Sequence, residues 1–322
     1  MSIVVALALL LVVLQGNEID RMDTAEQLLF PDFKSVANRI DNFSIQRLGD
    51  DEALAIHKID DRWTVPVRDN YTADVGKLRE LIIALADARI VEEKTSNPAY
   101  YSKLGVDDPA QGGNGTKLTA SGVGFSYTLI LGNRALGDFR YSRIDGEDMS
   151  FLIDQNPAIP VSASDWLLPN IIDIAVKRIQ KVSIVHMDGE TIVIAKDEEE
   201  QSDFDVLNIP KGRELSYATV GNGIAGALGN LTLRDVRRRT ESSPIVTTRY
   251  ETWDGQTIIA EVVSEDEQYW VSFSVSATVG DSTSGEESET INERLADWQY
   301  QLPEHKAKLL TQQWDSILKP QD

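Results

Sequence analysis

Two stretches of this chain, 139 positions apart, repeat the same order of apolar and turn residues. The first is FSIQRLGDDEALAIHK (Phe43–Lys58) and the second is VSIVHMDGETIVIAK (Val182–Lys196). In each, a turn of Gly and acidic residues separates two short apolar stretches, which is typical of a β-hairpin. Ser44-Ile45 aligns with Ser183-Ile184, and the turn of the second copy is one residue shorter. The repeat predicts that the chain carries two similar folded units.

The similarity continues after each hairpin. A third short strand is predicted at Arg62–Val65 and at Asp203–Val206. A helix follows each of these strands, at residues 75–85 after Asp74 and at residues 220–231, because apolar residues recur there at helical spacing. Each unit therefore begins with three strands and a helix.

A second β-rich section then follows in both copies, with hairpin turns expected at Ser121-Gly122 and at Asp254-Gly255. The first copy alone carries an insert, Asn97–Gly115. The period is far longer than the 20–50 residues of a solenoid, so separate domains are expected rather than a stacked array. The predicted fold class is α+β: two tandem similar units, each an antiparallel sheet with helices packed on one face, after an N-terminal hydrophobic helix. The alternative is that ordinary α+β patterning imitates a repeat, because short apolar runs align easily.

The chain divides into four expected parts. These are an N-terminal hydrophobic anchor or uncleaved signal at 1–16, a helical stalk at 17–40, the first α+β repeat at 41–176 and the second at 177–322. A helix is expected across 163–179, with Ser164 as the candidate N-cap, kinked or divided by Pro169. A flexible polar loop is expected at Gly280–Thr290, then an edge strand and a C-terminal helix that begins at Pro303.

The first residues form an unbroken apolar run, IVVALALLLVVL. A full membrane span needs about 20 residues, so this run fits a secretory h-region better by its length. No Lys or Arg precedes it and no A-x-A cleavage site follows it, so an uncleaved anchor is favoured over a cleaved signal and over a buried terminal helix or strand. Everything after residue 16 is then expected outside the cytoplasm. The expected anchor residues are Ile3, Val4, Val5, Leu7, Leu9, Leu10, Leu11, Val12, Val13 and Leu14.

Charge and composition exclude several classes of function. The 322 residues include 31 basic and 52 acidic side chains, a net charge of -21, and no Cys. Nucleic-acid binding and docking on anionic lipid are not expected, because both need Lys and Arg to displace counterions. Without Cys, disulfides and thiolate chemistry are excluded. The negative charge is expected to serve solubility, or else to meet a basic partner.

The search for chemistry finds no catalytic motif. Gly221–Gly226 spells G-x-G-x-x-G, but the preceding ELSYAT is too polar for the buried strand of a dinucleotide site. His57, His186 and His305 are scattered, without metal-ligand spacing. The acidic run Asp197–Glu200 lacks the alternating ligands of a calcium loop and is expected to be a solvated connection. We therefore expect no catalytic residue, no cofactor and no metal.

Two surface features are candidates for contacts with other molecules. Arg237, Arg238 and Arg239 stand together in an otherwise acidic chain and are possible partner contacts, although such a run often ends a helix or lines a strand edge. Trp253 and Trp270 are expected in cross-strand packing, and their exposure would instead indicate a polysaccharide platform.

The order of these segments resembles the bacterial family called domain of unknown function 4340. The resemblance begins near Phe43, covers most of the chain and is carried most specifically by Trp63, the stretch YSKLG at Tyr101–Gly105, Asp107 and Trp166-Leu167. The closing WQYQLPEHKAKLL also resembles the end of the family. The family resemblance implies a membrane-anchored protein that faces the periplasm and is encoded beside ABC-type export or gliding-like transport systems. It implies no catalytic residues.

The leading hypothesis is a non-catalytic envelope protein, held in the bacterial inner membrane by its N-terminal helix, with the bulk of the chain in the periplasm. Its expected partner is a protein of the envelope, including ABC transporter subunits. The alternative is an extracytoplasmic ligand-binding protein or enzyme with a pocket between the two repeats, because domain interfaces favour pockets.

Overall fold

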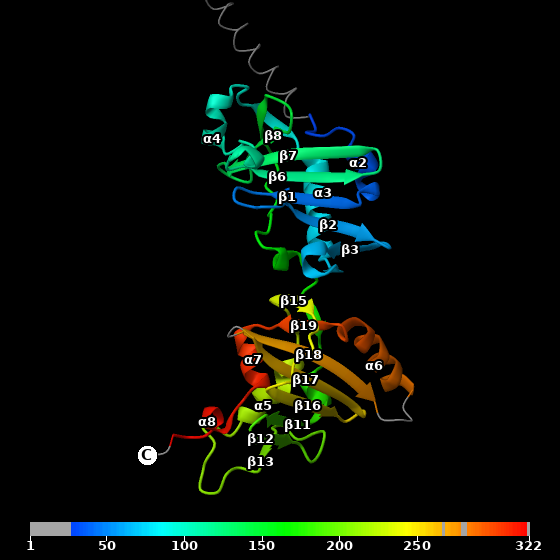
Figure 1. The fold of residues 1–322 in the computed structure, drawn as a ribbon, viewed down its shortest axis with the longest axis vertical. Helices are drawn as coiled ribbons and strands as arrows, with labels where there is room; N and C mark the ends of the chain where they lie inside the picture. The colour runs from blue at the N-terminus through cyan, green and yellow to red at the C-terminus, as the bar shows by residue number, and fades with distance from the viewer. Residues whose placement is uncertain (1–26, 266–267, 278–281, 321–322) are drawn as a thin grey trace, which may run out of the picture. The chain divides into compact units, whose positions relative to one another are not determined.

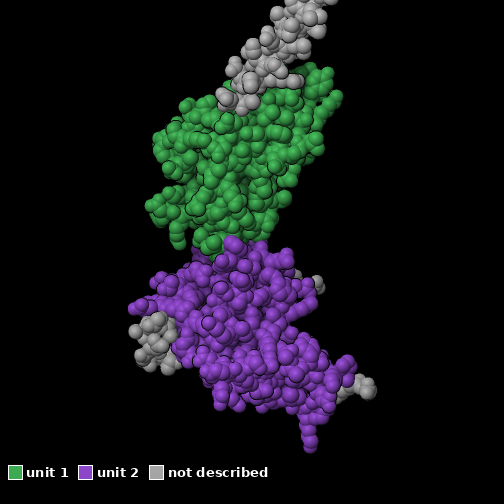
Figure 2. All heavy atoms as spheres, turned by 180° about the vertical axis from the view of Figure 1, so that it is seen from behind, with its two compact units in different colours: residues 1–168 green, residues 169–322 purple. Residues whose placement is uncertain are grey.

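The computed structural model describes residues 27–265, 268–277 and 282–320. The chain divides into two compact units, Met1–Leu168 (unit 1) and Pro169–Asp322 (unit 2) (Figure 1, Figure 2). Each unit is built on one large antiparallel sheet, which confirms the predicted α+β class with antiparallel sheets. The division lies before the boundary predicted after residue 176, because the carbonyl of Pro169 accepts a hydrogen bond from the amide of Leu233 in unit 2.

The sheet of unit 1 has the order β4-β3-β2-β1-β6-β7-β8-β9-β5. Its strands are β1 (Asn42–Gln46), β2 (Leu54–Ile59), β3 (Arg62–Val65), β4 (Tyr71–Thr72), β5 (Ile90–Glu93), β6 (Thr116–Gly122), β7 (Phe125–Arg134), β8 (Arg140–Ile144) and β9 (Ser150–Ile153). Its helices are α2 (Phe33–Val36), α3 (Val75–Asp87) and α4 (Tyr101–Leu104), with short 3-10 turns at Ala37–Arg39, Pro66–Arg68, Pro98–Tyr100, Pro109–Gln111 and Ala163–Trp166.

Strand alternation gives the sheet of unit 1 two different faces. The inner face carries fully buried residues such as Phe43 and Ile45, and α3 covers it (Figure 1). As predicted, α3 follows Asp74, whose carboxylate accepts hydrogen bonds from the amides of Gly76 and Lys77. The other face, called the outer face here, carries Asn42, Ser44 and Gln46, and residues of the insert cover part of it.

The described part of the predicted stalk is not a continuous helix. Residues 33–39 form only the four-residue α2 and one 3-10 turn, and Phe33 and Val36 are buried. Phe30 and Phe33 contact the ring of Tyr127 edge-on, with centroids 5.2 and 5.1 Å away. From residue 27 this segment is therefore packed into unit 1, because its aromatic side chains contact Tyr127 near the start of β7.

The main sheet of unit 2 has the order β13-β12-β11-β16-β17-β18-β19-β15, and β10 pairs with β14 beside it. Its strands are β10 (Asn170–Ile172), β11 (Ile179–His186), β12 (Thr191–Ala195), β13 (Asp205–Leu207), β14 (Leu231–Thr232), β15 (Asp235–Arg238), β16 (Val246–Thr252), β17 (Gln256–Glu265), β18 (Gln268–Ala277) and β19 (Trp298–Gln301). Its helices are α5 (Val220–Ala225), α6 (Ser282–Leu295), α7 (Glu304–Leu310) and α8 (Trp314–Ile317), with 3-10 turns at Val176–Arg178 and Gly226–Leu228.

Two buried hydroxyls show which face of this sheet is covered. Tyr250 donates to the carbonyl of Ile224 in α5 (3.2 Å), and Thr248 donates to the carbonyl of Leu310 at the end of α7 (2.6 Å). Both side chains lie on the same face of β16, so α5 and α7 cover this inner face together. The outer face carries Arg249 and Thr247.

The two sheets share one strand order. The order in unit 1 contains β3-β2-β1-β6-β7-β8-β9-β5, and the order in unit 2 is β13-β12-β11-β16-β17-β18-β19-β15. The two orders match strand by strand, and β4 at the edge of the first sheet has no counterpart in the second. The pairing register of the first hairpin also agrees. Ile45 pairs with Leu54 in unit 1, and Ile184 pairs with Ile192 in unit 2.

Several local predictions were wrong. Residues 163–179 are not one helix, because Pro169 lacks an amide hydrogen and residues 170–172 pair with β14 instead. The expected helix at 220–231 is the six-residue α5 and a 3-10 turn, and Leu231 already lies in β14. The turn between β6 and β7 lies at Val123-Gly124, where Gly124 takes the positive φ of 84°.

The C-terminal third also differs from the prediction. Residues 282–290 belong to α6 rather than to a polar loop. The predicted edge strand is β19, which lies inside the sheet because β18 and β15 pair with its two sides. The single helix expected from Pro303 is divided into α7 and α8. The end of the chain lies along the loop before α5, because the amide of Ser216 donates to the carbonyl of Ile317 and the amide of Lys319 donates to the carbonyl of Glu214.

Candidate functional site

In each unit the chain leaves the edge strand and crosses the outer face of the sheet to reach a strand in the middle of it. In unit 1 residues 94–115 run from β5 to β6, and in unit 2 residues 239–245 run from β15 to β16. A buried polar side chain of the last strand holds each crossing. Ser150 Oγ donates to the carbonyl of Thr95 (2.8 Å), and Gln299 Oε1 accepts a hydrogen bond from Thr240 Oγ1 (3.3 Å). A groove lies beside each crossing.

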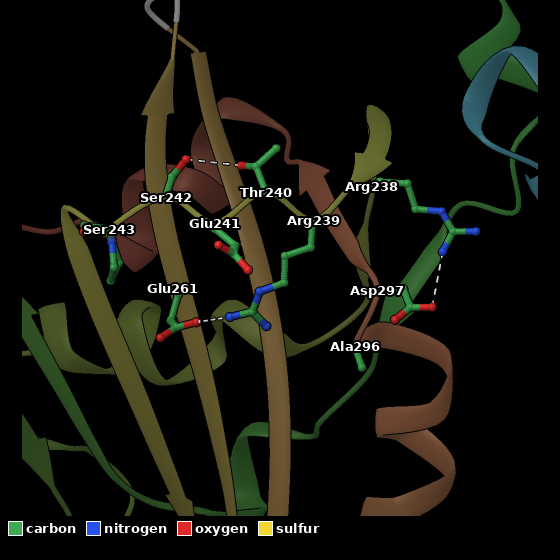
Figure 3. Close-up of a pocket in the computed structure, with 10 residues that line it drawn as sticks. Arg238, Arg239, Thr240, Glu241, Ser242, Ser243, Glu261, Ala296 and Asp297 are labelled. Carbon is green, nitrogen blue, oxygen red and sulfur yellow. Dashed lines mark hydrogen bonds and ion pairs between the residues drawn. The ribbon is translucent and has the colours of Figure 1, made fainter.

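The groove of unit 2 contains two of the three arginines predicted to contact a partner (Figure 3). Arg239 donates to Glu261 on β17 (2.6 Å), and Arg238 donates to Asp297 (3.2 Å). The hydroxyls of Thr240 and Ser242 lie 3.2 Å apart on the crossing segment. The cavity has a volume of about 790 Å³. It is lined by Arg238, Arg239, Thr240, Glu241, Ser242, Ser243, Pro244, Glu261, Ala296 and Asp297.

The third arginine, Arg237, is not among the residues that line this groove. The guanidinium of Arg237 stacks on Trp270 at 4.3 Å from the ring centroid and pairs with Glu265, whereas that of Arg238 stacks on Trp298 at 4.1 Å. Arg237, Arg238 and Arg239 thus each have an acidic partner within the chain. The run holds the edge strand β15 in place and does not form one continuous basic patch.

Unit 1 has a groove at the corresponding crossing, and a buried arginine forms its floor. Arg143 is only 8% exposed. It donates to the carbonyls of Val106 (3.1 Å) and Glu147 (3.0 Å), and its guanidinium lies 4.7 Å from the ring centroid of Tyr101. Tyr101 in turn donates to the carbonyl of Asp148. Arg143 therefore joins the insert to the turn between β8 and β9.

A lysine occupies the same groove between two carboxylates. Lys117 Nζ lies 3.1 Å from Asp108 and 3.0 Å from Asp145. Burial of the ammonium opposes its charge, but the hydrogen bonds to Asp145 and Asp108 outweigh this effect and raise the pKa of Lys117. The cavity has a volume of about 650 Å³. It is lined by Pro98, Tyr101, Asp107, Asp108, Gln111, Gly112, Gly113, Lys117, Arg143, Asp145, Gly146, Glu147 and Asp148.

Sequence reasoning missed the groove of unit 1 as a site. It identified Tyr101–Gly105 and Asp107 only as the stretches that carry the family resemblance. The available signal was the position of Lys117 and Arg143 on predicted strands, each close in sequence to a polar turn rich in Asp and Gly.

The structure separates most of the other predicted site residues. The anchor residues Ile3–Leu14 lie outside the described residues, and among those that are described no helix is both long and apolar enough to cross a membrane. His57, His186 and His305 belong to different elements, β2, β11 and α7. Over the described ranges no His, Asp or Glu residues gather closely enough to hold a metal ion.

The glycine-rich run lies on α5 and the preceding segment is a loop, so a dinucleotide fingerprint is not formed. A Cβ atom at Gly221 would lie 3.0 Å from the carbonyl oxygen of Phe204, so the helix packs close to the neighbouring chain. Trp270 is half-buried under Arg237 and Trp253 is half-buried as well, which does not favour an exposed polysaccharide platform.

Comparison with known proteins gives one match. The family model described as Domain of unknown function (DUF4340) matches residues 63–248, which is more than half of the chain. Searches of curated proteins and of solved structures found no match. The matched residues include α3, the insert, all of the groove of unit 1 and the crossing segment of unit 2. As the resemblance predicted, the chain belongs to the family of the Domain of unknown function (DUF4340).

Proposed function

We propose that this chain is a non-catalytic interaction protein of the bacterial cell envelope, an auxiliary component of an ABC-type transport system. The observation that supports it best is the state of the charged groups in the two grooves. Arg238 and Arg239 pair with Asp297 and Glu261, and Lys117 pairs with Asp108 and Asp145. Such grooves offer fixed donors and acceptors to a partner surface instead of an activated acid, base or nucleophile.

The place of the protein in the cell is part of this proposal. The apolar run at residues 3–14 and the family resemblance both support an N-terminal anchor in the inner membrane, with the two units in the periplasm. Fractionation of cells that express the full-length chain tests it. The protein should stay in the membrane pellet after a carbonate wash, and a variant lacking residues 1–16 should be released. Release of the full-length protein would rule out the anchor.

The transport role is tested by affinity purification of the full-length protein from detergent-solubilised membranes. We expect ABC transporter subunits to co-purify and their yield to fall when Arg239→Glu reverses one charge of the groove in unit 2. Arg79→Glu, an exposed change on α3, is the matched control and should leave the yield unchanged. Purification without any transporter subunit would contradict the transport role.

We also propose that the two units are copies of one ancestral unit. The shared strand order and the matching registers of β1–β2 and β11–β12 support this relationship. The grooves also support it, because each lies beside the corresponding crossing connection of its own unit, at residues 94–115 and 239–245. An experimental structure tests it through the hairpin register. Pairing of Ile184 with a residue other than Ile192 would contradict the duplication.

A further inference from the structure

Two arginines face each other across the hairpin of β7 and β8 in unit 1. Arg134 and Arg140 are direct cross-strand partners, an arrangement in which like charges destabilise a sheet. Arg140 donates to the carbonyls of Gly132 (2.9 Å) and Pro157 (3.1 Å). Among the described residues no ion pair joins Arg134 or Arg140 to a carboxylate. In a chain with a net charge of -21, two adjacent arginines without an acidic partner require an explanation.

A third arginine lies at the same end of the sheet. Arg47 follows β1 and donates to the carbonyls of Ile159 (3.1 Å) and Pro160 (2.7 Å). Burial and the nearby charges of Arg134 and Arg47 lower the pKa of Arg140, so the three guanidinium groups act on one another. The bonds to main-chain carbonyls hold the segment at 157–161. The carboxylate of Asp50 accepts a hydrogen bond from the amide of Arg47 (2.7 Å) and its charge acts on the Arg47 guanidinium, so the uncompensated charge is that of Arg134 and Arg140.

Exposed apolar side chains surround this cluster. Leu136 at the tip of the β7–β8 hairpin is 97% exposed, Val161 is 76% exposed and Leu48 is 54% exposed. We call the set of Arg47, Leu48, Arg134, Leu136, Arg140 and Val161 the hairpin surface. Arginine is enriched at protein interfaces relative to the rest of the surface, and the buried core of an interface is more apolar than its rim.

We propose that the hairpin surface docks a protein partner that places a carboxylate between Arg134 and Arg140 and an apolar pocket over Leu136. This inference rests on the proposed role as an interaction protein and adds the site and the chemistry of its partner. A carboxylate is the chemical complement of the paired guanidinium groups, and its approach would remove their mutual repulsion. A lipid surface fits less well, because the turn after Arg47 carries Asp50, Asp51 and Glu52, which an anionic bilayer would repel.

Site-specific photo-cross-linking in cells tests the surface directly. A photoreactive phenylalanine analogue at position 136 of the full-length chain should form an adduct with one protein, joined through a peptide that contains Asp or Glu. Arg134→Glu should lower the adduct yield about tenfold, as the loss of a central arginine contact does. Reversal of the acidic residue found in the partner peptide to Arg should restore the yield with Arg134→Glu.

Two matched controls give the result its meaning. The same analogue at position 123, the 89% exposed tip of the β6–β7 hairpin, should form no such adduct. Arg79→Glu should leave the yield at position 136 unchanged. Equal adducts at both tips, adducts with lipid alone, or an adduct that is insensitive to Arg134→Glu would each overturn the inference.

A stability measurement separates docking from a structural role. Arg134→Gln removes the like-charge pair, so its Tm should exceed that of the wild type while the adduct yield falls. A lower Tm with an unchanged adduct would assign Arg134 to the fold alone and overturn the inference.

If transporter subunits co-purify and position 136 forms no adduct, this inference fails and the proposed function stands. An adduct with a protein outside any transport system would support the surface and contradict the transport role.

Discussion

At the scale of single residues, the charged groups of unit 1 are satisfied in different ways. Arg143 is buried and its guanidinium donates to main-chain carbonyls, whereas Lys117 is held by two carboxylates. A buried cation is tolerated only where its donors have partners, so each of these groups links segments that are distant in sequence.

Removal of the Arg143 guanidinium should destabilise unit 1. Arg143→Met keeps much of the side-chain volume but leaves the carbonyl of buried Val106 without its donor and the ring of Tyr101 without its cation. We expect a loss of about 2–4 kcal/mol in the free energy of unfolding, measured by urea denaturation. Arg79→Met, at an exposed position of α3, should change the free energy of unfolding by less than about 0.5 kcal/mol. Equal effects of the two variants would contradict the role given to Arg143.

The pair formed by Lys117 predicts a dependence on alkaline pH. The pKa of Lys117 is raised in the folded protein, so the folded state holds this proton more tightly than the unfolded chain. The resulting stabilisation is complete below the unfolded pKa of about 10.4 and is lost as the pH rises through the higher folded value. The difference in unfolding free energy between wild type and Lys117→Gln should therefore be constant up to about pH 10 and shrink above it. A difference that grew above this pH would contradict the assignment.

At the scale of elements, the insert of unit 1 packs on β7 through backbone contact. A Cβ atom at Gly132 would lie 2.7 Å from Val106 Cγ1 and closer still to the carbonyl of Leu104. Only glycine lets the insert approach the strand this closely. In unit 2 the shorter crossing segment lies over the same part of the sheet and leaves the larger groove.

Gly132→Ala should therefore push the insert away from β7. We expect a loss of about 1–3 kcal/mol in unfolding free energy and faster proteolysis of residues 97–115. Gly226→Ala is the matched control, because no atom lies within 4 Å of its added Cβ and its backbone is not left-handed. A control that lost as much stability would show that the effect is not the contact with the insert.

At the scale of the whole molecule, each unit closes its own hydrophobic core. Ile45 in unit 1 and Ile184 in unit 2 occupy matching positions on β1 and β11, and both are buried. Separate cores are the usual requirement for domains that fold independently.

Core substitutions should therefore act on one unit at a time. Ile45→Ala and Ile184→Ala should each lower the stability of their own unit by about 2–5 kcal/mol. Hydrogen exchange followed by mass spectrometry should show faster exchange in residues 27–168 for the first variant and in residues 169–320 for the second. Equal loss of protection in both units after either change would contradict independent folding.

The elements whose stability is local could be predicted from the amino-acid sequence. The hairpins β1–β2 and β11–β12, strand β3 and the capped helix α3 follow from alternation, turn residues and the Asp74 cap, all within a few neighbouring positions. Family membership was also predictable, because it depends on residue identities alone.

Features that depend on contacts between distant residues could not be predicted in this way and became visible in the folded structure. The insertion of β19 between β18 and β15, the helical state of Ser282–Leu295 and the division of α7 from α8 are stabilised by partners far away in sequence. For α6 these partners include Asn292 with the backbone of Val275, and Glu287 with Arg178. Local propensity carries no information about such contacts, and for the same reason the two grooves and the opposed pair Arg134 and Arg140 emerged only from the pairing of the strands.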